Sequence, residues 1–343
     1  KNCGFQIRFE GDPEKKFYLR FKSENDSQKA TIDESSNTAR GLIKSYVKHL
    51  NKRSIHNAID YLRKNGVKKF IQRFKQGVNV DEYQNWFLKQ RVTAEELAKQ
   101  AKVQFEYSPK ISIAVATFNT KEEYLKEMID TVVHQSYSNW ELCIADGSTT
   151  DDVEKYIKAH YANYGDKIKF KRLNQNYGIS GNTNEALKLA TGDYIALLDH
   201  DDLIPRFCLY ELTKTINEHP DVEFIYTDED KIETTQATRR DPHFKPDFAI
   251  DTLRSNNYIT HLSVFKKELM DKLGGFRDKY NGAQDFDIIM RACEESKKII
   301  HIPKVLYHWR VHERSTAAGA GSKDYAIDAG KCAIESHLQR MGE

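Results

Sequence analysis

The sequence predicts an α/β fold in which a mostly parallel sheet lies between helices. From residue 109 onward, short apolar runs alternate with amphipathic stretches of helical length, and the connections between them are short. This alternation is typical of a parallel sheet covered by helices. Several apolar runs end in polar or acidic residues, and that end of a strand is where open α/β sheets bind their ligands.

The predicted elements follow one another from residue 111. The expected strands are Ile111–Thr117, Trp140–Ala145, Ile168–Leu173, Tyr194–Leu198, Glu223–Thr227 and Ile259–Phe265. The expected helices lie at about 121–135, 151–163, 181–191, 205–218, 284–296 and 324–340. The fourth strand carries no polar side-chain group except a tyrosine hydroxyl, so it is expected to be a buried central strand.

Residues 1–36 are expected to form the remnant of a β-hairpin followed by a linker. Apolar and charged residues alternate in Phe5–Phe9 and in Lys16–Phe21, and a Gly-Asp-Pro turn separates the two runs. The stretch from Glu24 to Asn37 is polar and rich in serine, which is typical of a linker. The chain does not begin with Met, so we expect it to be part of a longer protein.

Residues 37–108 are predicted to form a basic helical region. Apolar side chains recur at helical spacing, while the other helix faces of its first half carry many lysines and arginines and one acidic residue, Asp60. A basic amphipathic helix is typical of a segment on an anionic membrane surface. The alternative, that the apolar faces pack on a neighbouring domain, remains open. Three aromatic side chains of the second half are expected to pack inward: Tyr83, Trp86 and Phe87.

The composition restricts the classes of function. The chain has 343 residues and a net charge of +2, so its overall charge does not favour nucleic-acid binding. The five cysteines are scattered and none forms a CxxC pair, which favours reduced thiols in a cytosolic protein over disulfides or a zinc site. No apolar run approaches the roughly 18 residues of a membrane span.

Three carboxylates follow the buried strand directly, in Asp199-His200-Asp201-Asp202. Asp199 and Asp201 alternate along an extended backbone, so both side chains are expected on one face. Two hard oxygen ligands at this spacing suit Mg²⁺ or Mn²⁺, which in turn holds phosphate oxygens. The alternative is a solvated acidic turn that caps a helix beginning near Pro205, and the cluster alone does not decide between the two.

Three other loops follow expected strands and share the same edge of the sheet. They are Thr117-Phe118-Asn119, Asp146–Asp152 and Asn174–Asn182. In the second loop, the Asp146 carboxylate is able to accept a hydrogen bond from a base imide, but a simple helix-capping turn explains the loop equally well. In the third loop, Gly178 and Gly181 flank a helix start, where backbone N–H groups favour an anion.

In this order, the four loops resemble those of the family 2 glycosyltransferases of the GT-A fold, which bind sugar nucleotides. The resemblance covers roughly residues 108–335 and is strongest to bacterial enzymes that build O-antigens, capsules and other surface glycans. The segments that carry it are Ile111–Asn119, Glu141–Asp152, Asn176–Asn184, Ala196–Asp202, Tyr226–Lys231, Phe244–Asp247, Gly282–Asp285 and Leu306–Arg310. It implies that residues 109–343 form a GT-A domain with a nucleotide-binding sheet.

The resemblance implies a role for each matching residue. Asp146 would contact the nucleobase, Asp199 would hold the ribose or the metal, and Asp201 would bind the metal that bridges the two phosphates. The loop residues expected to bind the donor with them are Thr117, Asn119, Asn176 and Gly178. Two departures from the family pattern occur: Gly147 stands where a second acid is often found, and Gln284 stands where Glu often precedes the base.

The same resemblance assigns Asp285, at a helix start, as the catalytic base. It also implies that His308 or His312 is a third metal ligand and that Arg310 neutralises phosphate charge. An alternative remains open for these residues. Asp285 would then be only the N-cap of its helix, and His308 and Arg310 would lie on the solvated face of a strand.

Two further features are undecided at this stage. His261 is expected either to line the acceptor side of the site or to be a core histidine. The run Asp228-Glu229-Asp230 is either a second metal site or a solvated loop near the acceptor, and the loop is favoured.

The sequence therefore predicts a metal-dependent, inverting glycosyltransferase that uses Mn²⁺ or Mg²⁺ at the cytoplasmic face of a membrane. Its expected donor is a UDP- or dTDP-sugar, and its expected acceptor is a glycan, a glycoprotein or a lipid-linked sugar. A metal and cationic side chains would stabilise the leaving diphosphate, and a carboxylate would take the acceptor proton.

Inversion is implied by the resemblance, since one base and no dedicated nucleophile are present. Two rival functions remain. One is a nucleotidyltransferase, which usually carries a Gly-rich loop with Arg and Lys that Thr117-Phe118-Asn119 lacks. The other is an inactive, transferase-like scaffold, against which Asp201 and Asp285 argue.

Overall fold

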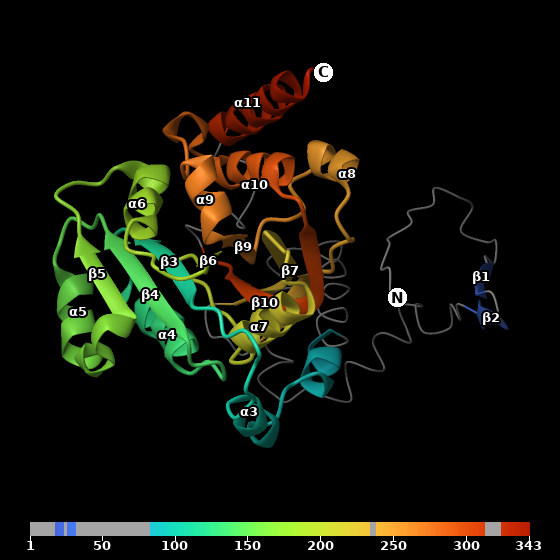
Figure 1. Cartoon of the computed structure of the whole chain (residues 1–343), viewed down its shortest axis with the longest axis horizontal. Helices are drawn as coiled ribbons and strands as arrows, with labels where there is room; N and C mark the ends of the chain where they lie inside the picture. The colour runs from blue at the N-terminus through green and yellow to red at the C-terminus, as the bar shows by residue number, and fades with distance from the viewer. Residues whose placement is uncertain (1–17, 24–25, 32–82, 234–237, 313–323) are drawn as a thin grey trace, which may run out of the picture. The chain divides into compact units, whose positions relative to one another are not determined.

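The computed structural model describes residues 18–23, 26–31, 83–233, 238–312 and 324–343 (Figure 1). The chain divides into two compact units, Lys1–Leu88 and Lys89–Glu343, which are described separately. Most of the basic stretch that the sequence analysis assigned to amphipathic helices lies outside the described residues, as does the expected strand Phe5–Phe9. Among the residues that are described, no helix is long and apolar enough to cross a membrane.

The described part of the first unit contains a β-hairpin whose position differs from the predicted one. Strand β1 (Tyr18–Ser23) overlaps the expected second strand, but it pairs antiparallel with β2 (Asp26–Thr31), which lies within the expected linker. The register joins Ser23 to Asp26, so two residues connect the strands, which is a common hairpin geometry. The polar composition of residues 26–31 predicted a linker. The structure has a strand there, because a tight turn lets neighbouring polar strands pair.

The aromatic residues at the end of the first unit pack only partly inward. Tyr83 is buried and its ring stacks on Trp86 at a centroid distance of 5.6 Å. Trp86 itself is 42% exposed, so the expectation that it packs inward is wrong for this side chain.

The second unit is built on a mixed sheet with the strand order β10-β7-β9-β6-β3-β4-β5, and β8 pairs with the far end of β7. The strands are β3 (Ile111–Thr117), β4 (Trp140–Asp146), β5 (Ile168–Arg172), β6 (Tyr194–Leu197), β7 (Phe224–Ile232), β8 (Arg239–His243), β9 (Ser263–Lys266) and β10 (Ile299–Arg310). Neighbours are parallel except where β9 pairs with β6 and β7 and where β8 pairs with β7. The predicted, mostly parallel sheet is confirmed.

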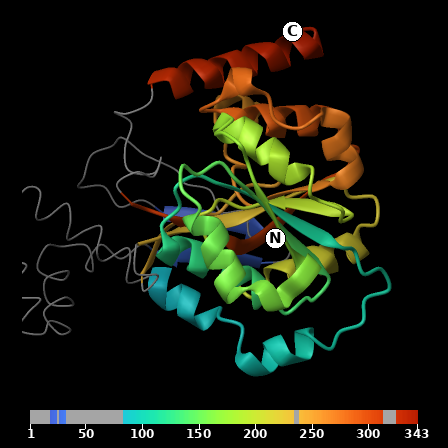
Figure 2. The same cartoon turned by 90° about the vertical axis from the view of Figure 1, so that its left-hand side faces the viewer.

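Helices cover both faces of this sheet (Figure 2). Apolar residues of α4 (Glu122–Val133), α5 (Asp152–His160) and α7 (Cys208–Glu218) share one core cluster with the sheet. The opposite cluster contains residues of α6 (Gly178–Leu187), α8 (Ile250–Ser255), α9 (Lys267–Leu273), α10 (Gln284–Glu295) and α11 (Asp324–Met341). The remaining elements are α3 (Ala94–Gln100), η2 (Ala162–Lys167) and η3 (Asp278–Tyr280).

The apolar sequence of the strands explains why both faces are covered. In β3, Ile113 and Val115 belong to the first cluster, while Ala114 between them belongs to the second. Alternate side chains of a strand point to opposite faces, so a continuous apolar run needs a partner layer on each side. The sheet is therefore enclosed, and only its two edges and its strand ends remain for polar chemistry.

Two strands differ from the prediction near the site. β7 extends to Ile232, so it includes the acidic run that was expected to be a loop. β10 was not among the expected strands, yet it runs parallel to β7 along most of its length. Its sequence mixes histidine, lysine and proline with apolar residues, so no clear alternation marks it as a strand.

Candidate active site

The loops that follow β3 and β4 are joined to each other at the carboxyl edge of the sheet. The Asn119 N–H donates to Ser148 Oγ at 2.8 Å, and the Thr149 N–H donates to Asn119 Oδ1 at 3.0 Å. Asn119 adopts a φ of 49°, a left-handed conformation that Asn tolerates better than most residues. Asn119 thus joins the two loops, whereas Thr117 is buried and its hydroxyl donates to Asp146. The expected contact of both residues with a donor stays a prediction.

Asp146 ends β4 and is completely buried, with an exposed fraction of 0%. Its Oδ1 accepts from Thr117 Oγ1 at 2.9 Å and from the Ser148 N–H at 3.1 Å, and its Oδ2 lies 3.3 Å from Arg172 Nη1. The predicted direct contact with a nucleobase is not available here, because these partners enclose the carboxylate. Asp146 instead holds Ser148 and Arg172 in place.

Arg172, at the end of β5, is a residue that the sequence analysis missed. Its guanidinium contacts the Asp146 carboxylate and donates to the backbone carbonyls of Ser148 and Thr150, which lie in the loop after β4. The Arg172 side chain is 30% exposed, whereas that of Asp146 is buried. Of this pair, the cation is therefore the group that reaches solvent at the edge of the sheet. Its position near the end of the expected strand Ile168–Leu173 was the signal that could have identified it.

The third loop leads into α6, which begins at Gly178. Asn176 Oδ1 accepts from the Gly178 N–H at 2.9 Å and from Asn182 Nδ2 at 2.8 Å. Asn182 also explains Gly147 in the neighbouring loop, because a Cβ on that glycine would lie 2.7 Å from Asn182 Nδ2. The β4 loop and the start of α6 therefore meet closely. The helix begins at Gly178, earlier than the expected residue 181, and the contact of Asn176 and Gly178 with a donor stays a prediction.

The acidic residues after β6 form a turn rather than the extended segment that was expected. The Asp202 N–H donates to the Asp199 carbonyl at 3.2 Å, which closes the turn. The Asp199 side chain is 58% exposed and that of Asp201 is 18% exposed. Asp202 is buried, and it accepts from Tyr307 Oη at 2.6 Å and from the Arg310 N–H at 2.7 Å. Two carboxylates thus remain accessible, while the third anchors the turn.

Arg310 lies beneath this turn and is fully buried. Its Nε donates to the Asp201 carbonyl at 2.6 Å, its Nη2 pairs with Glu127, and its guanidinium lies over the Tyr124 ring. The predicted contact between Arg310 and a phosphate is therefore wrong for this structure, and so is the alternative of a solvated strand face. The guanidinium supports the backbone of the acidic turn from below.

The two late histidines occupy different surroundings. His312 Nε2 lies 2.7 Å from Asp201 Oδ2, whereas His308 Nδ1 lies 2.6 Å from Asp230 Oδ1 in a buried pair. Burial lowers the pKa of His308 even though Asp230 lies beside it. Of the two, His312 is the one that meets the acidic turn.

The donor set around the turn fits a divalent ion in part. Asp201 Oδ2 and His312 Nε2 converge, and Asp199 offers an exposed carboxylate two residues away. Carboxylate oxygens and imidazole nitrogens are both ligands that Mn²⁺ accepts. Within the described ranges, no group of three or more His, Cys, Asp or Glu side chains is arranged as a complete metal site. Any further ligands would have to come from a bound diphosphate or from water.

His261 connects the acidic turn with the buried strand β7. Its Nδ1 lies 3.2 Å from Glu229 Oε2, its Nε2 lies 3.8 Å from Asp199 Oδ2, and its ring stacks on Tyr307. Burial disfavours the imidazolium, but the hydrogen bond and the charge of Glu229, with Asp199, outweigh it and raise the pKa of His261 to about 9. This side chain is thus a cation beside Asp199 at neutral pH.

The run Asp228-Glu229-Asp230 is part of β7 and all three side chains are buried, so the favoured interpretation as a solvated loop is wrong. Each carboxylate has a cationic or histidine partner: Asp228 with His301, Glu229 with Lys245 and His261, and Asp230 with His308. Buried carboxylates need such partners. The run is a support for the site and does not form a second metal centre.

Asp285 is the second residue of α10, and Ala283 is the N-cap, so the alternative that Asp285 caps the helix is wrong. Asn257 Nδ2 donates to Asp285 Oδ2 at 3.0 Å. Burial raises the pKa of the Asp285 carboxyl, and His261, nearby backbone N–H groups and Asn257 counteract part of this effect. The carboxyl also acts electrostatically on Asp199. A carboxylate with a raised pKa in such a position is suited to accept a proton.

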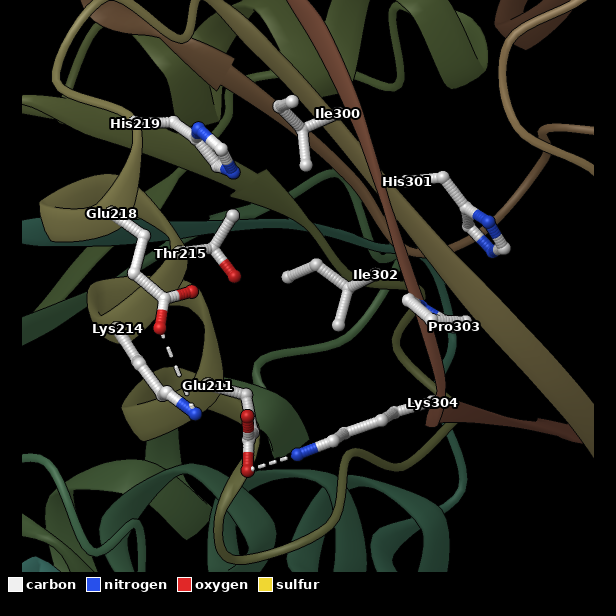
Figure 3. A pocket seen from close by; sticks show the side chains of 10 residues that line it. All are labelled: Glu211, Lys214, Thr215, Glu218, His219, Ile300, His301, Ile302, Pro303 and Lys304. Atoms are coloured by element: carbon white, nitrogen blue, oxygen red, sulfur yellow. Dashed lines mark ion pairs between the residues drawn. The ribbon is translucent and has the colours of Figure 1, made fainter. Parts of the chain in front are cut away.

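A cavity between α7 and the first half of β10 lies away from these residues (Figure 3). It is lined by Glu211, Lys214, Thr215, Glu218, His219, Ile300, His301, Ile302, Pro303 and Lys304. Its charged side chains neutralise one another, since Glu211 pairs with Lys304 at 2.7 Å and Lys214 with Glu218 at 3.8 Å. None of the residues predicted for the site lines it, so the chemistry is placed at the carboxyl edge instead.

Comparison with known proteins identifies the family of this chain. Residues 112–274 match the family model described as glycosyl transferase family 2. The uncharacterized protein y4gI of Sinorhizobium fredii is 44% identical over 68% of this chain, and the O-antigen biosynthesis protein RfbC of Myxococcus xanthus is 31% identical over 74% of it. The chain spans only 26% and 20% of the length of these two relatives.

Among solved structures, S. aureus TarS in complex with UDP-GlcNAc superposes with a TM-score of 0.56 and is 20% identical. The match covers 67% of this chain and 66% of that chain. This likeness shows the fold, and the predicted GT-A architecture is confirmed.

Proposed function

Because this chain belongs to glycosyl transferase family 2 through residues 112–274, we propose that it transfers a sugar from a nucleoside diphosphate to an acceptor hydroxyl with inversion at the transferred carbon. The observation that carries the proposal is the position of Asp285. This carboxyl has a raised pKa and acts on Asp199, which lies in the exposed acidic turn at the same edge of the sheet. A proton acceptor therefore lies near a site for a charged leaving group.

The donor is proposed to lie along the loops after β3, β4, β5 and β6. Asn119 and Arg172 would border the nucleoside, with Asp146, which also accepts from Thr117, fixing Arg172 from behind. Asn176 and Gly178 lie at the start of α6, the end of a helix whose dipole favours an anion, and Asn176 holds the Gly178 N–H there. The diphosphate would then reach the acidic turn.

Asp201 and His312, with Asp199, would hold a divalent ion at this turn. When bound, such an ion neutralises charge that develops on the departing diphosphate. The protein's own contribution is to fix the turn: Asp202 and Arg310 anchor it from below, and His261 adds a cation beside Asp199. These fixed charges need no rearrangement during the reaction.

Asp285 is proposed to take the proton of the acceptor hydroxyl while its oxygen attacks the sugar carbon. The bond from that carbon to the diphosphate oxygen breaks as the new glycosidic bond forms, and the proton remains on Asp285 until it passes to solvent. No second carboxylate is needed as a nucleophile, because one displacement inverts the carbon.

The acceptor is proposed to be a growing glycan or a lipid-linked sugar in bacterial surface-polysaccharide synthesis, as the name of the RfbC relative suggests. We propose that the reaction takes place on the cytoplasmic side of the membrane, where nucleotide sugars are available. UDP-GlcNAc, the ligand in the TarS structure, is the first donor to test.

The experiment is release of UDP from UDP-GlcNAc with Mn²⁺, without an acceptor and with glycan acceptors, for the wild type and for Asp285→Asn. We expect the variant to lose at least about a hundredfold in kcat, since general base catalysis contributes about 10²–10⁴-fold. Binding of UDP should be unchanged. Asp278→Asn, an exposed carboxylate in the same segment, is the matched control and should remain active. Full activity of Asp285→Asn would refute the assignment of the base.

A further inference from the structure

One short segment between α8 and β9, residues 257–261, contacts both groups of acidic side chains at the site. Its first residue, Asn257, donates from Nδ2 to Asp285 Oδ2 at 3.0 Å. Its last residue, His261, lies 3.8 Å from Asp199. The base lies in α10 and the acidic turn follows β6, far apart in the chain, so this segment is a physical link between them.

The segment is itself held in place by buried neighbours. Tyr258 is buried, its hydroxyl accepts from the Ala249 N–H at 3.0 Å, and its ring meets Tyr226 edge-on. Thr260 Oγ1 donates to Glu229 Oε2 at 2.9 Å. Because the residues that follow Asn257 are fixed in the core and to β7, the amide does not depend on its own bond to Asp285 for its position.

The amide orientation carries further information. Asn257 Oδ1 is buried and has no hydrogen-bond partner, while Nδ2 is used for Asp285. If the amide were turned around, Oδ1 would face a carboxylate oxygen, and two acceptors would meet. The side chain therefore leaves one polar atom unsatisfied, at a free-energy cost, and keeps a donor on Asp285. An amide that served only packing would not require this arrangement.

We propose that Asn257 is a positioning residue that holds one oxygen of the ionised Asp285 carboxylate and so fixes the direction in which the base meets the acceptor. The inference rests on the proposed function, in which Asp285 removes the acceptor proton. Asn257 acts through Asp285 and touches neither the donor nor the metal site.

The bond has a consequence for the strength of the base. Burial raises the pKa of Asp285, and the Asp199 charge faces it from the acidic turn. Three groups act in the opposite sense: His261, the backbone N–H groups at the start of α10, and the Asn257 amide. Removal of the amide donor destabilises the ionised form, so the pKa of Asp285 must rise further.

The test compares the pH dependence of kcat for UDP release from UDP-GlcNAc with Mn²⁺ in the wild type, Asn257→Ala, Asn257→Asp and Asn256→Ala. The ionised base is required, so activity rises with pH through the pKa of Asp285. We expect Asn257→Ala to lower kcat about tenfold, the loss of one hydrogen bond to a charged group, and to move this rise up by about one pH unit. The KM for the donor should be unchanged.

Asn257→Asp conserves the size of the side chain and places a second carboxyl beside the first, so it should move the rise at least as far. It also keeps the inference testable if the alanine variant fails to fold. Asn256→Ala is the matched control, because its side chain is exposed on the neighbouring residue. It should leave the profile unchanged.

An unmoved pH profile in both Asn257 variants, or a parallel increase in donor KM, would overturn the positioning role. A wild-type protein that releases no UDP from any sugar nucleotide has a different meaning, since that result refutes the proposed function itself and the inference with it.

Discussion

Two carboxylates at opposite ends of the sheet, Glu141 and Asp199, have opposite surroundings. At the amino end, Glu141 of β4 is completely buried and accepts from Ser112 Oγ at 2.7 Å and from the Thr191 N–H at 2.6 Å. Lys110 and Lys169 both pair with its Oε2. At the carboxyl end, Asp199 is 58% exposed and the imidazole of His261 is 3.8 Å away. One carboxylate is fully satisfied by the protein, and the other is left open.

The pKa values of Glu141 and of Asp285, at the carboxyl end, are shifted in opposite directions. Burial opposes ionisation of Glu141, but the hydrogen bonds from Lys110, the Thr191 N–H, Ser112 and Lys169 outweigh it and lower its pKa to about 2. At Asp285 burial prevails and the pKa is raised. A carboxylate with enough hydrogen-bond donors and cations around it stabilises the fold. A carboxylate with fewer such partners is ionised at a free-energy cost, which a bound ligand can reduce.

Arg310 is the strongest test of this comparison between satisfied and open charged groups. It lies at the carboxyl end of the sheet, but like Glu141 at the amino end it is fully buried and paired. Arg310→Ala would leave Glu127 and the Asp201 carbonyl without their side-chain partner and create a cavity beneath the acidic turn. We expect the free energy of unfolding to fall by about 3–5 kcal/mol, the usual effect of removing one partner of a buried charge pair. Urea unfolding measures it.

Lys99→Ala, which removes an exposed ion pair with Glu95, is the control and should change the stability by less than about 0.5 kcal/mol. If Arg310→Ala were as stable as this control, the guanidinium would not support the turn, and a direct role toward phosphate would return.

Glu141→Gln is expected to have the next largest effect. The amide retains the size of the side chain but loses the charge that pairs with two lysines, so we expect a loss of about 1–3 kcal/mol at pH 7. Because the pKa of Glu141 is lower in the folded state, its stabilisation is complete above about pH 4.5 and is lost as the pH falls toward about 2.

Urea unfolding at pH 7 and at pH 3 measures this difference. The gap between wild type and Glu141→Gln should be smaller at pH 3, and UDP release at pH 7 should be unaffected by the substitution. A gap that does not depend on pH would show that the Glu141 charge contributes nothing to folding.

Much of the fold could be predicted from the sequence, because β3, β4 and β6 are apolar runs whose ends carry distinctive polar residues. The open residues of the site, Asp199 and Asp201, were identified for the same reason. The burial of Arg310 and Asp146 could not be predicted, because it depends on partners far along the chain. The Arg310 guanidinium needs the Asp201 carbonyl and Glu127, 109 and 183 residues away.

The same reason explains the error in β7. In a sequence, a run of three acidic residues is normally interpreted as solvent-exposed. The parallel pairing of β7 with β10, which the sequence did not predict, places His308 beside Asp230. Local sequence determines which residues are polar, but tertiary contacts determine which of them are satisfied. The residues left unsatisfied are the ones to examine for function.

The most direct test of the account is the thermal and calorimetric response of the wild type and Asp199→Asn to UDP and Mn²⁺. The wild type should be stabilised only when both are present, by about 2.7 kcal/mol at a hundredfold excess over Kd. Asp199→Asn should be as stable as the wild type without ligand, within about 0.5 kcal/mol, because an exposed carboxylate is removed. It should lose most of the response to the pair. An equal response in both proteins, or one that persists in EDTA, would contradict the claim that the open carboxylates hold a metal-bound diphosphate.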